Sequence, residues 1–487
     1  MSSVAWKRVE EEQMSGGSCR LCIAHDSRAV AFSLSGQCLL YVFATALLLV
    51  WVTPARAKYA GGKGTSSDPY LIATARDLLD LAGEPNDWDA HLRLTADIDM
   101  ASLDGAIICI IGDEFVPFSG TFDGDGRQIL HYACLRPGHP KVGLFGYVRG
   151  MAAEIRNLRL VDPNVDGGTN DCVGALVGEL SYGRVTGCRV ENAHVYGSTA
   201  AGGLMGWNGG TVTDCLVCAE VCGSYSVGGL AGINSLRGEI LRCSVDARVT
   251  GINSVGGLIG NCVLASAQWS SASGLVTGSS YIGGLVGYSY GGEISNCYST
   301  SHTSGVLVAG GLVGSNSPSC NCSSGSRTGT IRNCYSAGRV DGQLDAGGLV
   351  GVTKPGCTVE NSFWDIATSG LSYSAGGIGL ATWQLQRRGT FMDAGWRFDP
   401  TGSPADGWMI RREPQYPSFA WQILDGDFDD DGDVDLRDFS ELAGRWSLPA
   451  IPFRTGGLDM TGDGQLDTRD LAILCQQWLQ GACPEQD

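Results

Sequence analysis

A five-residue phrase, Gly-Gly-Leu-Val-Gly, recurs with small variations through the middle of the chain and constrains its fold more than any other feature. Successive central leucines are 28, 26, 28, 27, 27 and 37 residues apart, and they are Leu176, Leu204, Leu230, Leu258, Leu285, Leu312 and Leu349. A repeat of this length with glycine at fixed offsets is typical of a solenoid. Each coil of a solenoid buries its apolar side chains only against its neighbours, so the chain grows by adding coils.

Each coil between residues 140 and 380 carries two further pieces besides the phrase. One is an apolar residue three positions before a cysteine, as in Val185 and Cys188. The other is Val-x-Gly, as in Val195–Gly197. Three short strand-like pieces separated by turns predict a right-handed parallel β-helix with three faces, whose leucines, valines, isoleucines and cysteines point inward. Glycine is expected at the corners because it tolerates positive φ.

The inward cysteines leave two alternatives open. Sixteen of the 19 cysteines lie after Lys58, and those of the repeats stack one coil apart. At a separation of about 4.8 Å between coils, stacked cysteines can meet the distance limits of a disulfide. Buried reduced thiols that act as small apolar side chains explain the pattern equally well.

Two coils depart from the pattern. The coil that begins at Gly256 has Gln268-Trp269 where its second piece is expected, and the coil from Gly310 is longer because it contains Asn316–Thr328. Insertions in solenoids become loops on one face, which is often the binding face. Any function of the rod is therefore expected at these two breaks, with simple drift in coil length as the alternative.

The N-terminal residues 1–57 resemble an export signal in their pattern. Residues 38–52 form an uninterrupted apolar run that is short for a membrane span. Ala55-Arg56-Ala57 follows as a small-x-small cleavage pattern. We therefore predict cleavage after Ala57 and a secreted or cell-surface protein. An uncleaved anchor is the alternative, and only then would the chain contact a membrane.

The regions that flank the repeats are expected to close the two ends of the rod. Residues 58–139 would form an N-terminal cap and the first coils, with a capping box of Thr74 and Asp77 starting a short helix that ends at Gly83. Residues 140–380 contain the repeats. The aromatic-rich residues 381–424 would then cover the C-terminal end, although aromatic side chains also suit stacking on sugar rings.

Negative charge is concentrated at the C-terminus. The whole chain has a formal net charge of −18, and residues 425–487 contain 15 Asp and Glu against 4 Lys and Arg. The sequence has no basic stripe of the kind that binds nucleic acid, so we expect no nucleic-acid partner. The acidic segment indicates metal binding instead.

The first half of this acidic segment has the spacing of a twelve-residue calcium loop. Oxygen-bearing side chains fall at positions 1, 3, 5, 9 and 12, with glycine at position 6 and a backbone carbonyl at position 7. The predicted ligands are Asp427, Asp429, Asp431, Asp433, Asp435 and Asp438.

A second copy of the loop follows after a helical stretch with apolar spacing. Its predicted ligands are Asp459, Thr461, Asp463, Gln465, Asp467 and Asp470. Because Thr461 offers a neutral hydroxyl in place of a carboxylate, this loop is expected to bind calcium more weakly. We therefore predict that residues 425–487 form a small α-helical domain that holds about two Ca²⁺ ions, one for each loop.

The duplicated loop and helix, with aspartate at position 12 and no entering helix, resembles a type I dockerin domain. This resemblance implies a calcium-dependent module that docks onto a cohesin-like scaffold or a cell-surface protein, often in polysaccharide degradation. Dockerins contact cohesin through positions 10 and 11, which are Leu436, Arg437, Thr468 and Arg469 here. Leu436, Arg437 and Arg469 differ from the small hydroxylated residues common at those positions.

The glycine phrase followed by Asn-Cys-Tyr-Ser, best developed at Gly283–Ser299, resembles the GLUG-motif repeats of bacterial surface proteins. That resemblance implies an adhesin-like or other extracellular binding protein without a shared catalytic site. We therefore expect an exported, non-catalytic protein whose rod binds a polysaccharide or another surface component. No catalytic residue is assigned.

An enzyme is the alternative function, because β-helices also include polysaccharide lyases and glycoside hydrolases that use clustered carboxylates. Acids in the repeats are scattered singly, and only Asp214 with Glu239, and Glu220 with Asp246, are spaced so that they could approach one repeat apart. Solvated surface acids explain them as well. A structural surface-layer component is the third alternative.

Overall fold

The computed structural model describes residues 20–21, 32–33, 58–103, 110–135, 139–169, 171–319, 327–398, 407–410, 414–422, 434–445 and 468–477. The chain divides into two units, Met1–Lys58 and Tyr59–Asp487. In the first unit, the described residues form two short antiparallel strands, β1 (Arg20–Leu21) and β2 (Phe32–Ser33). Within the described residues, no helix has the length and hydrophobicity needed to cross a membrane.

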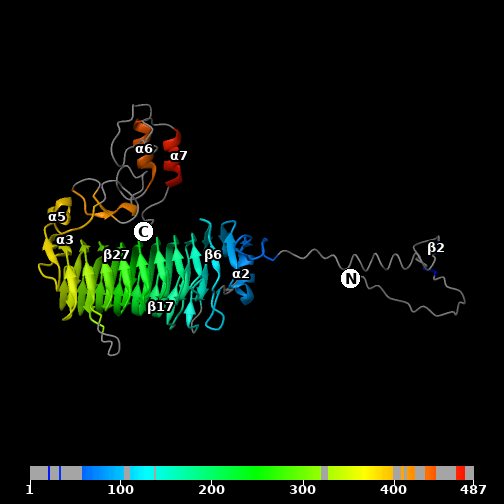
Figure 1. Ribbon diagram of the computed structural model, residues 1–487, viewed down its shortest axis with the longest axis horizontal. Helices are drawn as coiled ribbons and strands as arrows, with labels where there is room; N and C mark the ends of the chain where they lie inside the picture. Colours follow the sequence, from blue (N-terminus) through cyan, green and yellow to red (C-terminus); the bar gives the residue numbers. More distant parts are fainter. Residues whose placement is uncertain are drawn as a thin grey trace, which may run out of the picture. The chain divides into compact units, whose positions relative to one another are not determined.

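The second unit contains a parallel β-solenoid of about nine turns with about 28 residues per coil, and the stacked strands are visible in Figure 1. Three sheets run along it. The first sheet consists of β10 (Phe145–Val148), β15 (Val177–Leu180), β18 (Met205–Asn208), β21 (Ala231–Ser235), β25 (Ile259–Val263), β29 (Val286–Tyr290), β34 (Val313–Ser317) and β39 (Val350–Thr353). The second sheet consists of β3 (Tyr70–Ile72), β4 (His91–Leu94), β6 (Thr121–Asp123), β11 (Glu154–Arg156), β16 (Arg184–Thr186), β19 (Thr211–Thr213), β22 (Glu239–Leu241), β26 (Ser266–Gln268), β30 (Glu293–Ser295), β35 (Thr330–Arg332) and β40 (Thr358–Glu360).

The third sheet is the largest, because most coils contribute two or three short strands to it. It consists of β5 (Ile98–Asp99), β7 (Gln128–Leu130), β8 (Ala133–Leu135), β9 (Lys141–Val142), β12 (Arg159–Val161), β13 (Asn164–Asp166), β14 (Cys172–Gly174), β17 (Arg189–Gly202), β20 (Leu216–Gly228), β23 (Ser244–Thr250), β24 (Asn253–Gly256), β27 (Ser271–Gly278), β28 (Ser280–Gly283), β31 (Tyr298–Ser299), β32 (His302–Gly305), β33 (Val308–Gly310), β36 (Tyr335–Ser336), β37 (Val340–Gly342), β38 (Asp345–Gly347), β41 (Phe363–Asp365) and β42 (Ile378–Leu380). The predicted parallel, three-faced solenoid is therefore confirmed, with the third face bent where its short strands meet.

The core of the solenoid is built from columns of equivalent side chains. In the second sheet from β6 to β35, the middle residue of each strand points inward and pairs in register with the next coil, as Val212 does with Ile240 and Ile294 with Ile331. The leucine of each glycine phrase is likewise fully buried. A coil therefore buries its apolar side chains against the coils on either side, as the repeat length predicts.

The glycine phrase forms the corner between the third sheet and the first, but the expected reason for its glycines is wrong. None of these glycines has a positive φ. They are required because the coils approach too closely for a side chain. A Cβ at Gly284 would lie 2.2 Å from the carbonyl oxygen of Gly311, and a Cβ at Gly257 would lie 2.1 Å from that of Gly284.

Left-handed backbone occurs instead at the corner between the second sheet and the third. Asn157, Asp214, Asn296, Asn333 and Asn361 have φ values between 47° and 56° there. Asparagine and aspartate tolerate this conformation better than other residues with a Cβ. The residue after each of them points inward, and in the repeats it is usually cysteine. This corner explains the Asn-Cys of the repeat.

The inward cysteines of the repeats are reduced, so the second alternative holds for this column. Cys188, Cys215, Cys243, Cys297 and Cys334 are buried and free. Each thiol donates to a backbone carbonyl, as Cys334 Sγ does to Arg332 O at 3.1 Å. Burial raises the pKa of the Cys297 thiol well above its ordinary value. Cys218, outside this column, is disulfide-bonded.

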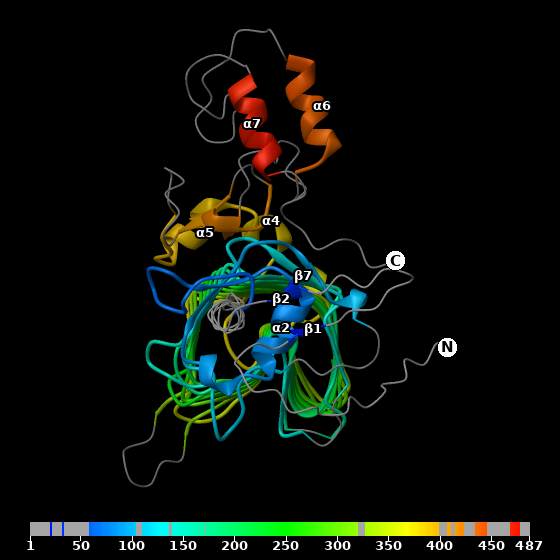
Figure 2. The ribbon, with the colours of Figure 1, turned by 90° about the vertical axis from the view of Figure 1, so that its right-hand side faces the viewer.

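The N-terminal end of the solenoid is closed by α2 (Ala75–Ala82), as Figures 1 and 2 show. Thr74 Oγ1 accepts from Asp77 N at 3.1 Å, and Asp77 Oδ2 accepts from Thr74 N at 3.0 Å. This reciprocal pair confirms the predicted capping box. Leu78 and Leu81 are fully buried in the same core as the coils, so the helix covers apolar side chains that the first coils would otherwise expose.

The segment after the last coil contains α3 (Ile366–Ser369), α4 (Thr382–Leu385), α5 (Arg388–Asp393), the hairpin β43 (Trp408–Met409) and β44 (Ser418–Phe419), and the 3-10 helix η3 (Ala420–Gln422). Its contacts reach back along the outer side of the third sheet. The Gln422 side-chain amide donates to Ser271 Oγ at 2.8 Å and Ser244 Oγ at 3.3 Å, and its carbonyl accepts from Tyr298 OH at 2.8 Å. The segment therefore covers the side of several coils.

Candidate functional site

Most residues predicted to bind calcium lie outside the described residues. In the first loop these are Asp427, Asp429, Asp431 and Asp433, and in the second they are Asp459, Thr461, Asp463, Gln465 and Asp467. The end of each loop is described, with Asp435 and Asp438 in the first and Asp470 in the second.

The end of the first loop forms a helix cap. Asp435 Oδ1 accepts from Arg437 N at 2.6 Å, and Asp438 Oδ2 accepts from Asp435 N at 2.8 Å, at the start of α6 (Leu436–Arg445). Asp435 therefore caps the first turn of α6, and the Asp438 side chain accepts the backbone N–H of the cap residue. A carboxylate offers about four lone-pair sites, so one capping bond does not exhaust its capacity to accept. The donor set fits a Ca²⁺ ion, which binds oxygen ligands.

The second helix, α7 (Thr468–Gln477), repeats the burial pattern of the first. Asp438 and Asp470 are both fully buried, and Leu442 and Leu474 occupy equivalent buried positions four residues further on. The four residues predicted to contact a partner are exposed on the first turns of the two helices, and they are Leu436, Arg437, Thr468 and Arg469. Among the described residues, no three His, Cys, Asp or Glu side chains gather as a metal-binding group.

The two side chains of the first break, Gln268 and Trp269, make different contacts. Trp269 has a left-handed φ of 50°, at the corner where asparagine is usual. Its ring centroid lies 6.0 Å from that of Trp408 and 5.8 Å from that of Phe419. Trp269 therefore belongs to the packing between the coils and the C-terminal segment. The expectation that it marks a binding site is not supported by this contact.

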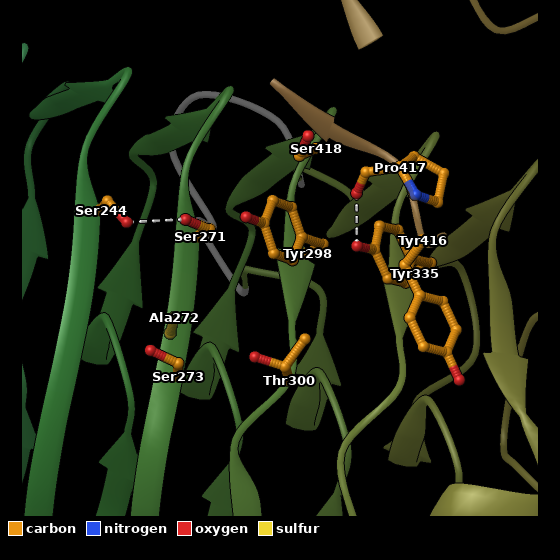
Figure 3. Close-up of a pocket in the computed structure, with 10 residues that line it drawn as sticks. All are labelled: Ser244, Ser271, Ala272, Ser273, Tyr298, Thr300, Tyr335, Tyr416, Pro417 and Ser418. Atoms are coloured by element: carbon orange, nitrogen blue, oxygen red, sulfur yellow. Dashed lines mark hydrogen bonds between the residues drawn. The ribbon is translucent and has the colours of Figure 1, made fainter. Parts of the chain in front are cut away.

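A hollow of about 330 Å³ lies where the C-terminal segment meets the third sheet (Figure 3). Its tyrosine rings cover one another. Tyr298 and Tyr335 stack at 5.1 Å with an interplanar angle of 5°, and Tyr416 stacks on Tyr335 at 6.1 Å. The Tyr335 hydroxyl donates to Pro417 O at 2.6 Å, and burial raises the pKa of this phenol. These rings hold the segment in place, so their faces are not available to a sugar.

Gln268, the other residue of the first break, lies on the second sheet beside the end of the insertion Asn316–Thr328. Gln268, Arg327 and Thr328 line one hollow of about 640 Å³. We call it the polar hollow, and its charged and amide side chains are Arg237, Glu239, Gln268, Glu293 and Arg327. The structure therefore brings one member of each break to the same place on the solenoid.

The two pairs of acids that are spaced about one repeat apart do not lie in register with each other. Asp214 lies at a left-handed corner and pairs with Arg242, whose Nε is 2.6 Å from Asp214 Oδ1. Glu239 is in register with Thr211 instead. Glu220 is in register with Arg248, not with Asp246. Asp214 and Glu239 do not share an outward column because Asp214 follows the strand, so the alternative of separate, solvated surface acids is favoured.

These features define a parallel β-solenoid protein whose coils are joined by glycine corners and a column of buried cysteines. The family model described as the GLUG motif matches residues 278–304, which run from the end of β27 to β32. Within the solenoid, this part of the chain is therefore similar to the GLUG motif.

The two similar sequences match only part of this chain, which spans a small part of their own length. Halomucin of Haloquadratum walsbyi is 36% identical over 150 residues, which are 30% of this chain and 2% of halomucin. A candidate Gly-rich membrane protein of Evansella cellulosilytica is 36% identical over 137 residues, which are 27% of this chain and 16% of that protein. A crystal structure of a candidate immunoglobulin A1 protease from Bacteroides ovatus aligns with a TM-score of 0.41 and 21% identity, covering 75% of this chain and 96% of that one.

Proposed function

We propose that this chain is an exported, non-catalytic binding protein of the adhesin type. The solenoid presents a long binding face to a polysaccharide or another surface component. The C-terminal module binds two calcium ions and docks the protein to a cohesin-like or cell-surface partner. An extracellular location is supported by the names of two relatives, a halomucin and a candidate membrane protein.

The observation that carries the calcium part of this proposal is the duplicated end of the loop. Asp438 and Asp470 are both fully buried at position 12, each within the first turn of a helix. Burial of an ionised carboxylate has a high free-energy cost unless other groups interact with its charge. Bound calcium would supply positive charge to the loops, and the predicted ligands would hold it through their oxygens.

Calcium titration tests this proposal directly. Fragment 425–487 is expected to gain helical circular dichroism when calcium is added, with a stoichiometry of about two ions from the two loops. In the full chain, Asp438→Asn should remove the tighter binding event and Asp470→Asn the weaker one. A fragment that shows no change in circular dichroism on adding calcium contradicts the proposal.

A charge-matched control separates loop ligands from general acidity. Glu485→Gln with Asp487→Asn removes two negative charges outside the loops, and this variant should titrate as the unmodified chain does. Docking is then tested by a pull-down from the surface fraction of the source cell, with calcium and with chelator. Capture that is the same under both conditions argues against a calcium-dependent dock.

A polysaccharide lyase or glycoside hydrolase on the same solenoid is the second candidate function. The observation in its favour is that Glu239 and Glu293 lie on either side of Ser266 in one outward column. Two strand spacings separate their backbones by about 9.6 Å, so side chains that lean toward each other could bring the carboxyl groups within the spacing of about 6.5–9.5 Å found in inverting glycosidases. Assays for reducing ends and unsaturated products across a polysaccharide panel test it, and a panel without any product argues against it.

A further inference from the structure

The polar hollow exists because one coil has small side chains where its neighbours have large ones. The outward column of the second sheet runs Glu239, Ser266, Glu293 and Thr330 in register. Ser266 therefore leaves a gap between two glutamates. The base of the insertion borders this gap, where Ser319 N donates to Arg327 O at 2.9 Å and Arg327 N donates to Ser319 Oγ at 3.0 Å. These two bonds fix the backbone of Arg327.

The charged groups of the hollow differ from other charged groups on the same sheet. Several other outward charges on this sheet pair, as Arg156 does with Asp123 and Arg332 with Glu360. Among the described residues, the four charged side chains of the hollow form no ion pair, and all four are exposed: Arg237, Glu239, Glu293 and Arg327. Two carboxylates and two guanidinium groups therefore remain available to a ligand, with no net charge between them.

This donor and acceptor set matches a polyhydroxylated ligand. A carboxylate accepts hydrogen bonds and a guanidinium donates them, while the Gln268 amide does both. Sugar hydroxyls both donate and accept, so they can satisfy all three kinds of group. A Ca²⁺ ion is disfavoured because it takes six to eight oxygen ligands, whereas two arginine side chains line the same hollow. A phosphate-rich ligand is disfavoured by the two carboxylates.

Two tyrosines lie on β29 of the first sheet, the strand that leads into the lining of the hollow. Tyr290 directly precedes Gly291, which lines the hollow, and its ring stacks with that of Tyr288 at 6.4 Å with an interplanar angle of 16°. Tyr281 packs on Tyr288 with its ring centroid 5.2 Å away. All three rings are only half-buried. Tyrosine combines an apolar ring with a polar tip, which suits contact with a sugar ring and its hydroxyls.

We propose that the polar hollow is an oligosaccharide-binding subsite for a neutral glycan, with Glu239, Gln268, Glu293 and Arg327 as its hydrogen-bonding groups. The inference rests on the proposed function, in which the solenoid is the ligand-binding part. The glycan lies across β22, β26 and β30, along the direction in which the coils stack.

The experiment is affinity electrophoresis of the full chain in gels that contain xylan, glucomannan, hydroxyethylcellulose or polygalacturonate. We expect retardation by at least one of the three neutral polymers, unchanged by chelator. Glu293→Ala and Gln268→Ala should each raise the dissociation constant, the former by about tenfold or more, because a hydrogen bond to a charged group contributes that much. Both residues are on the surface, and melting curves verify that the variants fold.

Glu154→Ala is the matched control, because Glu154 lies in the same outward column but is paired with Arg156. It should leave the retardation unchanged. Retardation that Glu293→Ala and Gln268→Ala leave intact would place the glycan elsewhere on the solenoid and overturn the subsite while sparing the proposed function. No retardation by any neutral polymer, or retardation by polygalacturonate alone, also overturns it. The calcium titration is independent of all these outcomes.

Discussion

Replacing Gly257 by alanine tests why this repeat has glycine at its corners. A Cβ at this position would lie 2.1 Å from Gly284 O and 2.9 Å from Ala272 Cβ, whereas a real Cβ keeps at least 3.0 Å from such atoms. The two coils must therefore separate locally by about 0.9 Å. The φ of Gly257 is not positive, so backbone conformation adds no further cost.

The size of the effect follows from the hydrogen bonds that this separation stretches. Gly257 N donates to Gly283 O at 3.2 Å, Leu258 N to Leu285 O at 2.9 Å, and Ile259 N to Leu285 O at 3.0 Å. Each would exceed the length of a hydrogen bond after the shift. At about 1 kcal/mol for each bond, the loss is about 3 kcal/mol, the upper end of the range for overpacking a core. We expect Gly257→Ala to lower the free energy of unfolding by this amount.

Alanine variants of two other glycines distinguish the steric effect expected at Gly257 from the effects of helix propensity and of backbone conformation. Gly389 lies in α5, and an added methyl group there would meet nothing within 4 Å, so Gly389→Ala should stabilise the chain by up to about 1 kcal/mol through helix propensity. Gly126 has a φ of 72° and open space around it, so Gly126→Ala should cost about 1–2 kcal/mol through conformation alone. The assay is urea unfolding followed by circular dichroism. A Gly257→Ala variant less affected than Gly126→Ala would refute the steric explanation.

Three further predictions concern the C-terminal segment and the buried thiols. Trp269→Asn keeps a residue that tolerates the left-handed corner but removes the ring that packs against Trp408, so limited proteolysis should release the segment sooner. Tyr335→Phe leaves Pro417 O without its 2.6 Å hydrogen bond and should lower the free energy of unfolding by about 1–3 kcal/mol. The Cys297 thiol keeps its proton in the folded chain, because burial raises its pKa, but loses it on unfolding above its ordinary pKa of 9.0. Stability should therefore fall as the pH rises above this value, which urea midpoints would detect, and Cys297→Ala should weaken the fall.

The solenoid could be predicted because the sequence repeats with a nearly constant period. The spacing of the leucines and the pairs such as Val185 and Cys188 identified the strands and their inward side chains. The role of the glycines could not be derived in the same way. A glycine is required both where φ is positive and where two backbones approach closely, and the sequence pattern is the same in both cases. The Asn-Cys pairs held the missing signal, because asparagine marks the left-handed corner.

The polar hollow could be predicted only as two separate places. Gln268 and Arg327 are far apart in the sequence, and the longer coil between them disturbs the period from which a shared face is inferred. Asp214 and Glu239 show the same difficulty in a simpler form, since spacing near one repeat does not reveal which residue lies in the strand and which lies at the corner. For the calcium loops, the described residues Asp435 and Asp438 agree with the predicted start of a helix, and the metal itself stays a prediction.

The three hydrogen bonds of the Gln422 side chain also fix how many coils can lie beneath the C-terminal segment. The chain leaves the last coil at β41, returns along the third sheet and reaches Tyr298, Ser271 and Ser244 at fixed steps. Duplicating or deleting a coil between Ser244 and Phe363 would leave this amide about 4.8 Å from its partners. Coils before Ser244 are under no such restriction. Variation in length is therefore expected to accumulate in the N-terminal half of the rod, while the number of coils beneath the C-terminal segment stays constant.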